Sequence, residues 1–481
     1  MNFLVLINGA PKYKYFFAEI AKKIEAQGHS VYFAVNAKKS SIIEPLDYID
    51  KSKKSFFFDD YMSINLEEIK LKKNNINETW GDVFYSDFDR FFFHNYNLEN
   101  NSDYWLQVVK GLDSFFQEII DTKKIDIVLY ENVSNSFAYM AYKKIIQSGK
   151  IYLGLMGSRI PNRYEIQTSI YKDELNFIES LIINQYDKEE EEWYNYYLSS
   201  ILSIQPDYMK NNILNSKITL NSIFKFKKIK TLYVYLKAFM ITDYYFDYQT
   251  GHPIKSLIAM FLLNFQKRKN ENSTKKYYIS NVELEKHIQN GEKFFIYPTH
   301  YHPESSTSVL ASNYTNEFNN ILNIHNNLPI GTYLYVKDHV SARGVQNEEF
   351  YIKIKALPGV RLIDFNYNVK SLIKKSQGVI TVNSTVGYEA IILGKPVFLL
   401  GNVFYERFPN VFKVENFYNL RQCISNFVLA SDIDVKKYIL AYYRYTYPGK
   451  LLINQPEKWS DDYFENLVSS IIHKIENINS K

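Results

Sequence analysis

The stretch GVITVNSTVGYEAIILGKPVFLLG, Gly378–Gly401, reads as a buried strand, a polar turn, a helix and a second buried strand. The first strand ends at Val382, and Asn383, Ser384 and Thr385 form the turn that opens the helix. Unpaired N–H groups and the helix dipole make a helix N-terminus a binding site for phosphate. The stretch therefore predicts a strand–helix–strand unit with a candidate phosphate site. The alternative is that Ser384 is only the helix N-cap.

The same helix carries two further candidate residues. Gly387 has no side chain, so a ligand or a strand can approach its backbone closely. Glu389 lies one turn into the helix, where its carboxylate can turn back toward the phosphate site and accept hydrogen bonds from ribose hydroxyls. Its alternative role is that of an ordinary carboxylate on the helix surface.

The pattern of this unit extends over the region from about residue 276 to residue 425. Apolar runs alternate there with segments of helical periodicity, and this alternation is typical of a parallel sheet in an α/β fold. The runs expected to form strands are KFFIYP, TYLYVKDH, VRLID, GVITV and PVFLLG. Because the carboxyl ends of parallel strands meet at one edge of the sheet, polar residues that follow these strands should lie together.

The loop after KFFIYP, with the sequence THYHPESSTS, is rich in titratable and hydroxyl side chains. A histidine works near its own pKa and burial can raise the pKa of a glutamate, so His302 and Glu304 are candidate general acids or bases. Ser305, Ser306 and Thr307 are candidate partners of a bound donor. A single His-x-His pair is weak ground for a metal site, because no third ligand follows at a telling spacing. We therefore expect no metal.

A third strand end, in YVKDHVSARG, supplies Lys337, Asp338 and His339, with Arg343 close in the sequence. Lys337 or His339 can meet a phosphate at this position, and the alternative is an ordinary charged strand terminus. Taken with the two loops above, three strand ends of one sheet should bring together groups for phosphate binding, ribose binding and acid–base chemistry.

The N-terminal region predicts a second α/β lobe. A strand at Asn2–Ile7, a helix and the strand SVYFAV form a doubly wound unit, and a second unit joins strands at Ile125–Tyr130 and Ile151–Leu155. The spacing G-x-G-x-x-G is missing from the first loop, which argues against a nicotinamide cofactor. The loop GSRIPNRYEI after the last strand carries Arg159 and Arg163 as candidate acceptor-side residues.

We expect four segments along the chain: a Rossmann-like lobe at 1–168, a helical, aromatic-rich insertion at 169–275, a second Rossmann-like lobe at 276–425 and a helical segment at 426–481. Two α/β lobes leave a cleft between them, the usual place for a ligand. In the insertion, the basic and aromatic stretch Phe224–Phe239 is either an amphipathic surface for anionic lipid or a helix that packs its aromatic residues on the protein body. Residues 256–269 have the same two interpretations.

Composition narrows the class of protein. The 481 residues include 57 basic and 52 acidic side chains, and the net charge of +5 is too mild for a dedicated nucleic-acid-binding protein. The one cysteine, Cys423, excludes an internal disulfide and fits a reducing compartment. The chain shows neither a signal peptide nor a membrane-spanning apolar run, so we expect a cytoplasmic protein. Residues 224–239 are a candidate peripheral contact with the inner face of the cytoplasmic membrane.

Three motifs, YPTHYHPESSTS, YVKDHVSARGVQNEEFYIKIKALPGVRLID and VITVNSTVGYEAIILGKPVFLLGNVFY, occur in this order between Ile296 and Tyr405. This region resembles the capsule polysaccharide biosynthesis glycosyltransferase family, which includes bacterial Kdo transferases. The resemblance implies a GT-B fold, in which two Rossmann-like lobes face a cleft and the C-terminal lobe holds the donor nucleotide. It also implies transfer of a sugar from a nucleotide-sugar substrate, with no cofactor and no required metal.

The resemblance assigns roles to residues of this chain. Those that fall on the family's donor motifs are Pro303, Glu304, Ser305, Ser306, Thr307, Lys337, Asp338, His339, Ser384, Thr385, Gly387 and Glu389. Two positions depart from the pattern, because the loop's usual Gln is His302 and the proline after the strand-end histidine is Val340. The donor can therefore be CMP-linked or UDP-linked.

The sequence thus predicts a metal-independent glycosyltransferase that acts on a surface polysaccharide or lipid-linked glycan acceptor. His302 and Glu304 are its catalytic candidates beside the donor, and Glu131 is the candidate that activates the acceptor hydroxyl. Two other functions remain open: a nucleotide-sugar epimerase, which needs no acceptor, and a non-catalytic glycan-binding subunit of an assembly complex.

Overall fold

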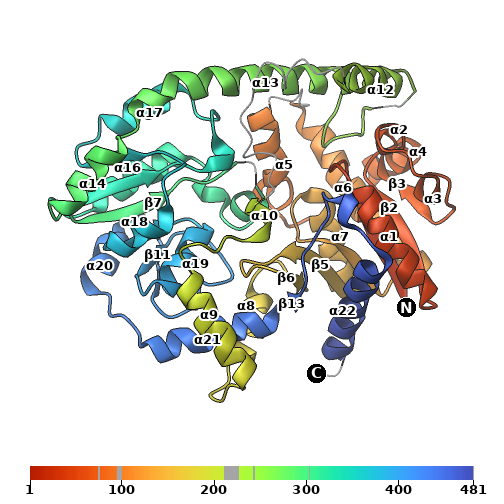
Figure 1. Cartoon of the computed structure of the whole chain (residues 1–481). Helices are drawn as coiled ribbons and strands as arrows, with labels where there is room; N and C mark the ends of the chain where they lie inside the picture. The colour runs from red at the N-terminus through yellow and green to blue at the C-terminus, as the bar shows by residue number, and fades with distance from the viewer. Residues whose placement is uncertain (74–75, 95–99, 211–226, 242–243, 303, 480–481) are drawn as a thin grey trace.

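The computed structural model describes residues 1–73, 76–94, 100–210, 227–241, 244–302 and 304–479. Its elements form two lobes, each built on its own sheet, with helices packed around both (Figure 1). Pro303 and residues 224–226 of the expected lipid-binding stretch lie outside the described residues.

The N-terminal sheet has seven strands in the order β13-β6-β5-β4-β1-β2-β3. The strands from β5 to β3 pair in parallel, whereas β6 runs antiparallel to β5 and β13 antiparallel to β6. Their bounds are β1 Asn2–Ile7, β2 Ser30–Val35, β3 Ser55–Phe57, β4 Ile127–Glu131, β5 Ile151–Gly157, β6 Arg163–Gln167 and β13 Tyr447–Pro448.

The C-terminal sheet has six strands, all parallel, in the order β12-β11-β10-β7-β8-β9. Their bounds are β7 Phe294–Pro298, β8 Tyr333–Lys337, β9 Val360–Ile363, β10 Gly378–Thr381, β11 Val397–Leu399 and β12 Val411–Lys413. The parallel sheet expected for this region is confirmed, and the three strands whose ends carry the predicted site, β10, β7 and β8, are direct neighbours.

Both faces of the C-terminal sheet are buried, which explains its continuous apolar runs. Alternate residues of β7 enter different cores: Phe294 and Ile296 pack on one face, and Phe295 and Tyr297 on the other. Strands covered on both faces are apolar at every position instead of every second one. Two Rossmann-like lobes of this kind are the GT-B fold expected from the sequence.

Helices connect the strands in each lobe. In the N-terminal lobe they are α1 Tyr13–Ala26, α2 Lys39–Ile43, α3 Asp47–Asp50, α4 Phe58–Leu71, α5 Trp80–His94, α6 Ser102–Lys123 and α7 Ser136–Gln147. In the C-terminal lobe they are α14 Asn281–Gln289, α15 Ser305–Ser308, α16 Glu317–Asn327, α17 Glu348–Lys355, α18 Val369–Lys375, α19 Thr385–Ile392 and α20 Phe417–Asn426. Short 3₁₀ turns lie at Lys275–Tyr277, Ser312–Tyr314, Val340–Ala342 and Pro456–Lys458.

The remaining helices tie the two lobes together. They are α8 Lys172–Ser180, α9 Lys188–Ser200, α10 Asp207–Lys210, α12 Lys227–Ile241, α13 Pro253–Thr274, α21 Asp432–Tyr445 and α22 Asp461–Asn479. Helices α8, α9 and α21 share the core on one face of the C-terminal sheet, whereas α22 returns to the N-terminal core and packs on α1. Helix α13 runs along one edge of the molecule from α12 to α17 (Figure 1).

One loop expected from the sequence is a strand in the structure. The second half of GSRIPNRYEI forms β6, which pairs antiparallel with β5 from Gly157↔Tyr164 to Gly154↔Gln167. Tyr164 and Ile166 are buried there, so core packing holds the strand. A short apolar run between polar residues does not predict such packing from the sequence. Strands β3, β12 and β13 were also not predicted, because runs of two or three residues carry no periodicity. Within the described ranges, none of the helices is long and apolar enough to cross a membrane.

Candidate active site

A cavity of about 1220 Å³ lies between the two lobes. It is lined by the loops that follow β1 and β4 in the N-terminal lobe and β7, β8 and β10 in the C-terminal lobe. Small-molecule sites usually measure about 300–1,000 Å³. The cavity is therefore somewhat larger than the usual site for one small molecule.

The strand order reverses in both sheets at this cavity. In the C-terminal sheet the chain runs from β7 outward to β8 and β9 and then returns to β10 on the other side of β7. In the N-terminal sheet it runs from β1 to β2 and β3 and then returns to β4. The loops diverge at such a switch point and leave a crevice, which is where doubly wound sheets bind ligands. The β7/β10 and β1/β4 gaps are therefore the two expected ligand positions.

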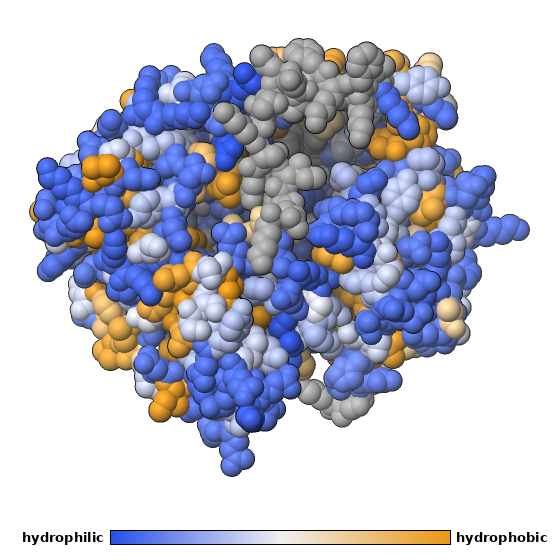
Figure 2. All heavy atoms as spheres, viewed as in Figure 1, coloured by the Kyte–Doolittle hydropathy of each residue, from blue (hydrophilic) through white to orange (hydrophobic). Residues whose placement is uncertain are grey.

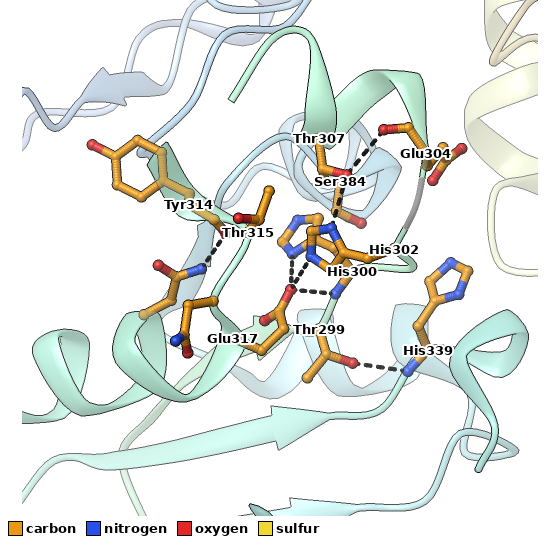
Figure 3. A network of polar contacts seen from close by, with 12 residues as sticks. Thr299, His300, His302, Glu304, Thr307, Tyr314, Thr315, Glu317, His339 and Ser384 are labelled. Atoms are coloured by element: carbon orange, nitrogen blue, oxygen red, sulfur yellow. Dashed lines mark hydrogen bonds and ion pairs between the residues drawn. The ribbon is translucent and has the colours of Figure 1, made fainter. Parts of the chain in front are cut away.

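His300, directly after β7, is held by Glu317 at the start of α16 (Figure 3). Glu317 Oε1 accepts from the His300 backbone N–H over 2.9 Å and lies 3.0 Å from its Nδ1. Burial favours a higher pKa for Glu317, but His300 and His302 outweigh it and lower the pKa to about 2. The carboxylate thus holds the proton of His300 on Nδ1, and Nε2 faces the end of β10, 3.4 Å from Thr381 Oγ1 and 3.5 Å from Asn383 N.

His302 contacts the same carboxylate as His300 but lies away from the cavity. Its Nε2 is 3.3 Å from Glu317 Oε1, and its Nδ1 is 3.2 Å from Thr307 Oγ1. His302 and Thr307 are buried and do not line the cavity, whereas His300 does. The histidine that the loop presents to the cavity is therefore His300, although the sequence interpretation favoured His302. Across the described ranges, His, Cys, Asp and Glu side chains form no group of three or more that could hold a metal ion.

Glu304 and Ser305 open the short helix α15 and line the cavity. The Glu304 side chain is exposed at the cavity, yet the protein around the cleft displaces enough water to raise its pKa, and the nearby Arg159 guanidinium opposes this shift. Ser305 Oγ accepts a hydrogen bond over 3.1 Å from Asn132 Nδ2, so the loop touches the N-terminal lobe. A carboxyl group with a raised pKa holds its proton more readily and suits proton transfer better than an ordinary carboxylate.

The turn before α19 also faces the cavity. Ser384 is the helix N-cap, with its Oγ accepting from Val386 N over 3.3 Å, and Thr385 lines the cavity beside it. Asn383 donates through Nδ2 to the backbone carbonyl of Ser306, but its buried Oδ1 has no hydrogen-bond partner among the described residues. Because a buried acceptor without a partner costs free energy, Asn383 Oδ1 marks a position for a donor group of a ligand.

Gly387 has a different role from the one expected. A Cβ atom at this position would lie 2.4 Å from Tyr405 Oη, and Gly387 does not line the cavity. The Tyr405 hydroxyl donates to the Ser384 carbonyl over 2.5 Å. The glycine therefore makes room for a tyrosine that braces the turn from behind, and the close approach is that of Tyr405 instead of a ligand.

Glu389 lies on the cavity wall between two lysines. Its Oε1 is 3.2 Å from Lys370 Nζ, and burial raises its pKa while Lys370 opposes the shift. Lys337 Nζ donates to the Phe365 carbonyl over 2.8 Å, and burial lowers the pKa of Lys337 to about 8. This part of the wall thus combines an acceptor for hydroxyl groups with cations for an anionic group.

His339 and Asp338 complete the wall after β8. His339 Nδ1 accepts from Ser341 N over 3.1 Å, and its backbone N–H donates to Thr299 Oγ1 over 3.0 Å. Burial lowers the pKa of His339 to about 4, so the ring is neutral at pH 7 with its proton on Nε2. Asp338 is fixed by hydroxyl donors, since Tyr278 donates to its Oδ2 over 2.5 Å and Thr299 to its Oδ1 over 3.0 Å.

The N-terminal wall carries Glu131 at the end of β4. Its carboxylate accepts from the Tyr13 hydroxyl over 2.6 Å and from Ser134 Oγ over 2.7 Å. Burial and the Glu131 carboxylate raise the pKa of Tyr13, so the hydroxyl stays a donor. Arg159 also lines the cavity, with its guanidinium 5.7 Å from the centre of the Phe404 ring.

Arg163 does not reach the cavity. It lies on β6, where Nε donates to Thr446 Oγ1 over 2.6 Å and Nη2 donates to the Tyr443 carbonyl over 3.1 Å. Its guanidinium also stacks 4.0 Å from the centre of the Tyr443 ring. Arg163 fastens β6 to the end of α21, so only one of the two arginines expected on the acceptor side is at the site.

Several polar groups of the N-terminal wall were missed in the sequence. Asn36 Nδ2 donates to Gln249 Oε1 over 2.8 Å, and Gln249 Nε2 donates to Asp87 Oδ1 over 3.2 Å. Burial raises the pKa of Asp87, with Arg90 opposing the shift. Asn36 directly follows β2, a signal that could have identified it. Asp87 lies within α5 and Gln249 lies between α12 and α13, positions that carry no comparable signal.

Comparisons with known proteins agree with the motif resemblance. A family model described as "Capsule polysaccharide biosynthesis protein" matches residues 200–408. A comparison with curated protein sequences gives no match.

Solved structures matched in the comparison share little sequence with this chain. KpsC of Thermosulfurimonas dismutans, a beta Kdo 2,4 transferase, is 14% identical, with 68% of this chain and 85% of that chain covered and a TM-score of 0.37. MnaA of S. aureus, solved with UDP, is 12% identical, with 100% and 98% covered and a TM-score of 0.29. UDP-GlcNAc 2-epimerase of Neisseria meningitidis, bound to UDP-GlcNAc, is 13% identical, with both chains fully covered and a TM-score of 0.28.

These scores are low, so the description of the fold rests on the strand order and not on the likenesses. A shared fold would in any case leave the function open. The match over residues 200–408 contains the three strand-end motifs and the cavity residues that follow them. Over these residues the chain carries the sequence pattern of the capsule polysaccharide biosynthesis family, which confirms the resemblance found in its motifs.

Proposed function

We propose that this chain is a glycosyltransferase of capsule or surface-polysaccharide assembly. It transfers a sugar from a CMP- or UDP-linked donor to a glycan or lipid-linked glycan acceptor. The observation that carries the proposal is the meeting, at the β7/β10 switch point, of the α19 N-terminus, the unsatisfied Asn383 Oδ1 and the His300–Glu317 pair. All three lie within the family match.

In this proposal the donor nucleotide binds to the C-terminal wall. Its phosphate lies at the turn of Ser384 and Thr385, where helix-terminal N–H groups and hydroxyls favour an anion. Lys337 or His339 provides a further contact from the neighbouring strand end. Glu389 accepts hydrogen bonds from the ribose hydroxyls, a role supported by its place on the cavity wall.

Transfer breaks the bond between the sugar and the nucleotide phosphate and forms a new glycosidic bond to the acceptor oxygen. Stabilising the negative charge left on the phosphate supplies most of the rate, because fixed donors act strongly in a water-poor cleft. Glu304 stands near the sugar, and its raised pKa suits a group that exchanges a proton there. Glu131 on the opposite wall takes the proton of the acceptor hydroxyl. Such acid–base help contributes about 10²–10⁴-fold.

The proposed reaction uses no metal. The proposal also places the chain in the cytoplasm, with peripheral contact to the inner face of the cytoplasmic membrane where a lipid-linked acceptor is presented. The single cysteine, Cys423, fits a reducing compartment and supports this location.

The test is turnover with a panel of CMP- and UDP-linked sugars, with and without a bacterial lipid extract as acceptor. The proposal is supported if nucleotide is released only when the acceptor is present. Glu304→Gln should reduce this release at least tenfold, because it removes a group that exchanges a proton near the sugar. Release of an epimerised free sugar without acceptor would instead identify an epimerase. Absence of turnover and of nucleotide binding with every donor would overturn the proposal in favour of a non-catalytic subunit.

A further inference from the structure

Helices α12 and α13 pack against each other along one edge of the molecule (Figure 1). They present a row of exposed apolar side chains, which we call the outer apolar face. In Figure 2 orange atoms emerge beside the grey ones at the upper right, where Figure 1 places α12. The most exposed members of the face are Leu232, Tyr233, Leu236, Met240, Ile258 and Leu262.

The spacing of these residues places them on one side of each helix. Leu232, Leu236 and Met240 follow one another at intervals of four on α12, so they lie on one side of the helix. Ile258 and Leu262 repeat this interval on α13. Met240 is 74% exposed and Leu262 is 58% exposed, values that a packed core helix does not show. Exposed apolar patches of this kind mark binding surfaces.

On the described residues of α12 and α13, the exposed charged side chains are lysines. Lys230 and Lys237 on α12 and Lys255 on α13 are exposed beside it. From Lys227 to Asn270 the sequence holds only two acidic residues, Asp243 and Asp247. Asp247 is buried and paired with Lys39, so it does not offset the exposed lysines. Apolar side chains flanked by lysine suit the interface of an anionic membrane, where the chains enter the acyl boundary and the ammonium groups meet the headgroups.

The opposite sides of the same helices face the cavity. Tyr235 of α12 and Ser256 and Met260 of α13 line it, and Ala238 is fully buried. Each helix thus has an inner side on the cavity and an outer side on solvent. A surface that bound the outer side would lie one helix thickness, roughly 10 Å, from the site.

We propose that the outer apolar face of α12 and α13 docks on an anionic lipid membrane and holds the cavity next to the bilayer surface. The docking itself stands on the apolar spacing and the charge. That it delivers a lipid-linked acceptor to the cavity rests on the proposed function. The exposed lysines beside the apolar side chains complement anionic headgroups and the apolar side chains complement the acyl boundary, so we take an anionic bilayer as the occupant.

The experiment is co-sedimentation of the full chain with vesicles of phosphatidylcholine alone or mixed with phosphatidylglycerol. Binding to the mixed vesicles only, weakened by high salt, is expected. Leu236→Glu with Met240→Glu should abolish sedimentation. Replacing Lys230, Lys237 and Lys255 by Gln should reduce the partition coefficient roughly fivefold for each lysine.

The matched control is Val282→Glu with Ile433→Glu, two exposed apolar residues on the distant helices α14 and α21. It should sediment like the wild type. Nucleotide binding is measured on every variant, independently of sedimentation, as a check on folding and on the donor site. A variant that loses docking but still binds nucleotide leaves the proposed function standing. Equal loss in the control pair, unchanged sedimentation of the α12 variant, or no binding to either vesicle would overturn the membrane proposal.

Discussion

The two walls of the cavity hold their polar groups in different ways. On the C-terminal wall, Glu317 binds both His300 and His302, and Asn383 reaches from the β10 end to the β7 loop through Ser306. These contacts join neighbouring strand ends of one parallel sheet. On the N-terminal wall, the Glu131 carboxylate accepts from Tyr13 and Ser134, and a second set of bonds runs from Asn36 through Gln249 to Asp87.

This difference indicates how each wall responds to change. A network of shared partners transmits the loss of one member to the others, because each bond orients the next. Where the bonds form smaller sets, the loss of one member reaches only the rest of its own set. The C-terminal wall should therefore behave as one unit that fixes the donor, whereas the N-terminal wall should tolerate single changes and accommodate an acceptor of variable shape.

The largest expected effect is that of Glu317→Gln. The variant removes the carboxylate that orients His300 and His302, so the turnover number should fall by about 10²-fold, the cost of misplacing groups of the site by about 1 Å. Tyr13→Phe, which removes one of the two side-chain bonds to Glu131, is the matched change on the other wall and should lower turnover much less. Steady-state kinetics of the two variants compares the walls directly. Equal losses of turnover in the two variants would contradict the proposed difference between the two walls.

The second expected effect separates two carboxylates of the C-terminal wall. Glu389→Ala should weaken donor binding about 10–100-fold, since hydrogen bonds to a charged group contribute about 1.5–3 kcal/mol, and should leave turnover at saturation nearly unchanged. Glu304→Ala should lower turnover and leave donor affinity nearly unchanged. Calorimetric Kd values beside turnover numbers decide this, and the reverse pattern would contradict both assignments.

The lowered pKa of Lys337 leads us to expect that donor binding depends on pH. Burial holds its pKa at about 8, so in the free protein the ammonium group loses its proton as the pH rises past 8. A bound phosphate favours the charged form, and the donor Kd should therefore rise above pH 8, by less than tenfold per pH unit. Lys337→Arg keeps the charge at every pH tested and should flatten this rise. A Kd that stays constant from pH 7 to about pH 10 in the wild type would exclude Lys337 from the phosphate site.

The smallest effect concerns the brace behind the α19 turn. A Cβ at Gly387 meets Tyr405 Oη, so Gly387→Ala should lower the free energy of unfolding by about 1–3 kcal/mol. Tyr405→Phe removes the clashing oxygen, and the double variant should be less destabilised than the sum of the two single changes. Urea denaturation of the three variants measures this coupling. Strict additivity would show that the two residues do not press on each other.

Residues of the C-terminal wall could be predicted because they follow buried strands in sequence. The apolar runs of β7, β8 and β10 identified the strands, and the parallel sheet then placed Glu304, Lys337, His339 and Ser384 at one edge. The choice between His300 and His302 depends on which ring reaches the cavity. Because residues two positions apart in an extended segment point to the same side, the sequence does not distinguish them. That choice needed the position of Glu317, seventeen residues after His300 and on a different element.

The N-terminal wall could be predicted only in part. Glu131 and Arg159 follow strands and were found, but Arg163 was placed in a loop that is the strand β6. Gln249 reaches the wall because the segment between α12 and α13 packs into the N-terminal lobe, where the Tyr248 hydroxyl lies 2.8 Å from Ser136 Oγ. Contacts between segments more than a hundred residues apart leave no periodic trace in a single sequence.

The most direct test of the central claim is the binding of CMP, UDP and GDP to the full chain by titration calorimetry, with Glu389→Gln and Arg163→Ala beside the wild type. The donor site at the β7/β10 switch point predicts tight binding of one nucleotide, clear weakening in Glu389→Gln and no change in Arg163→Ala, because Arg163 lies outside the cavity. Binding that Glu389→Gln leaves intact, or no binding of any nucleotide, would contradict it.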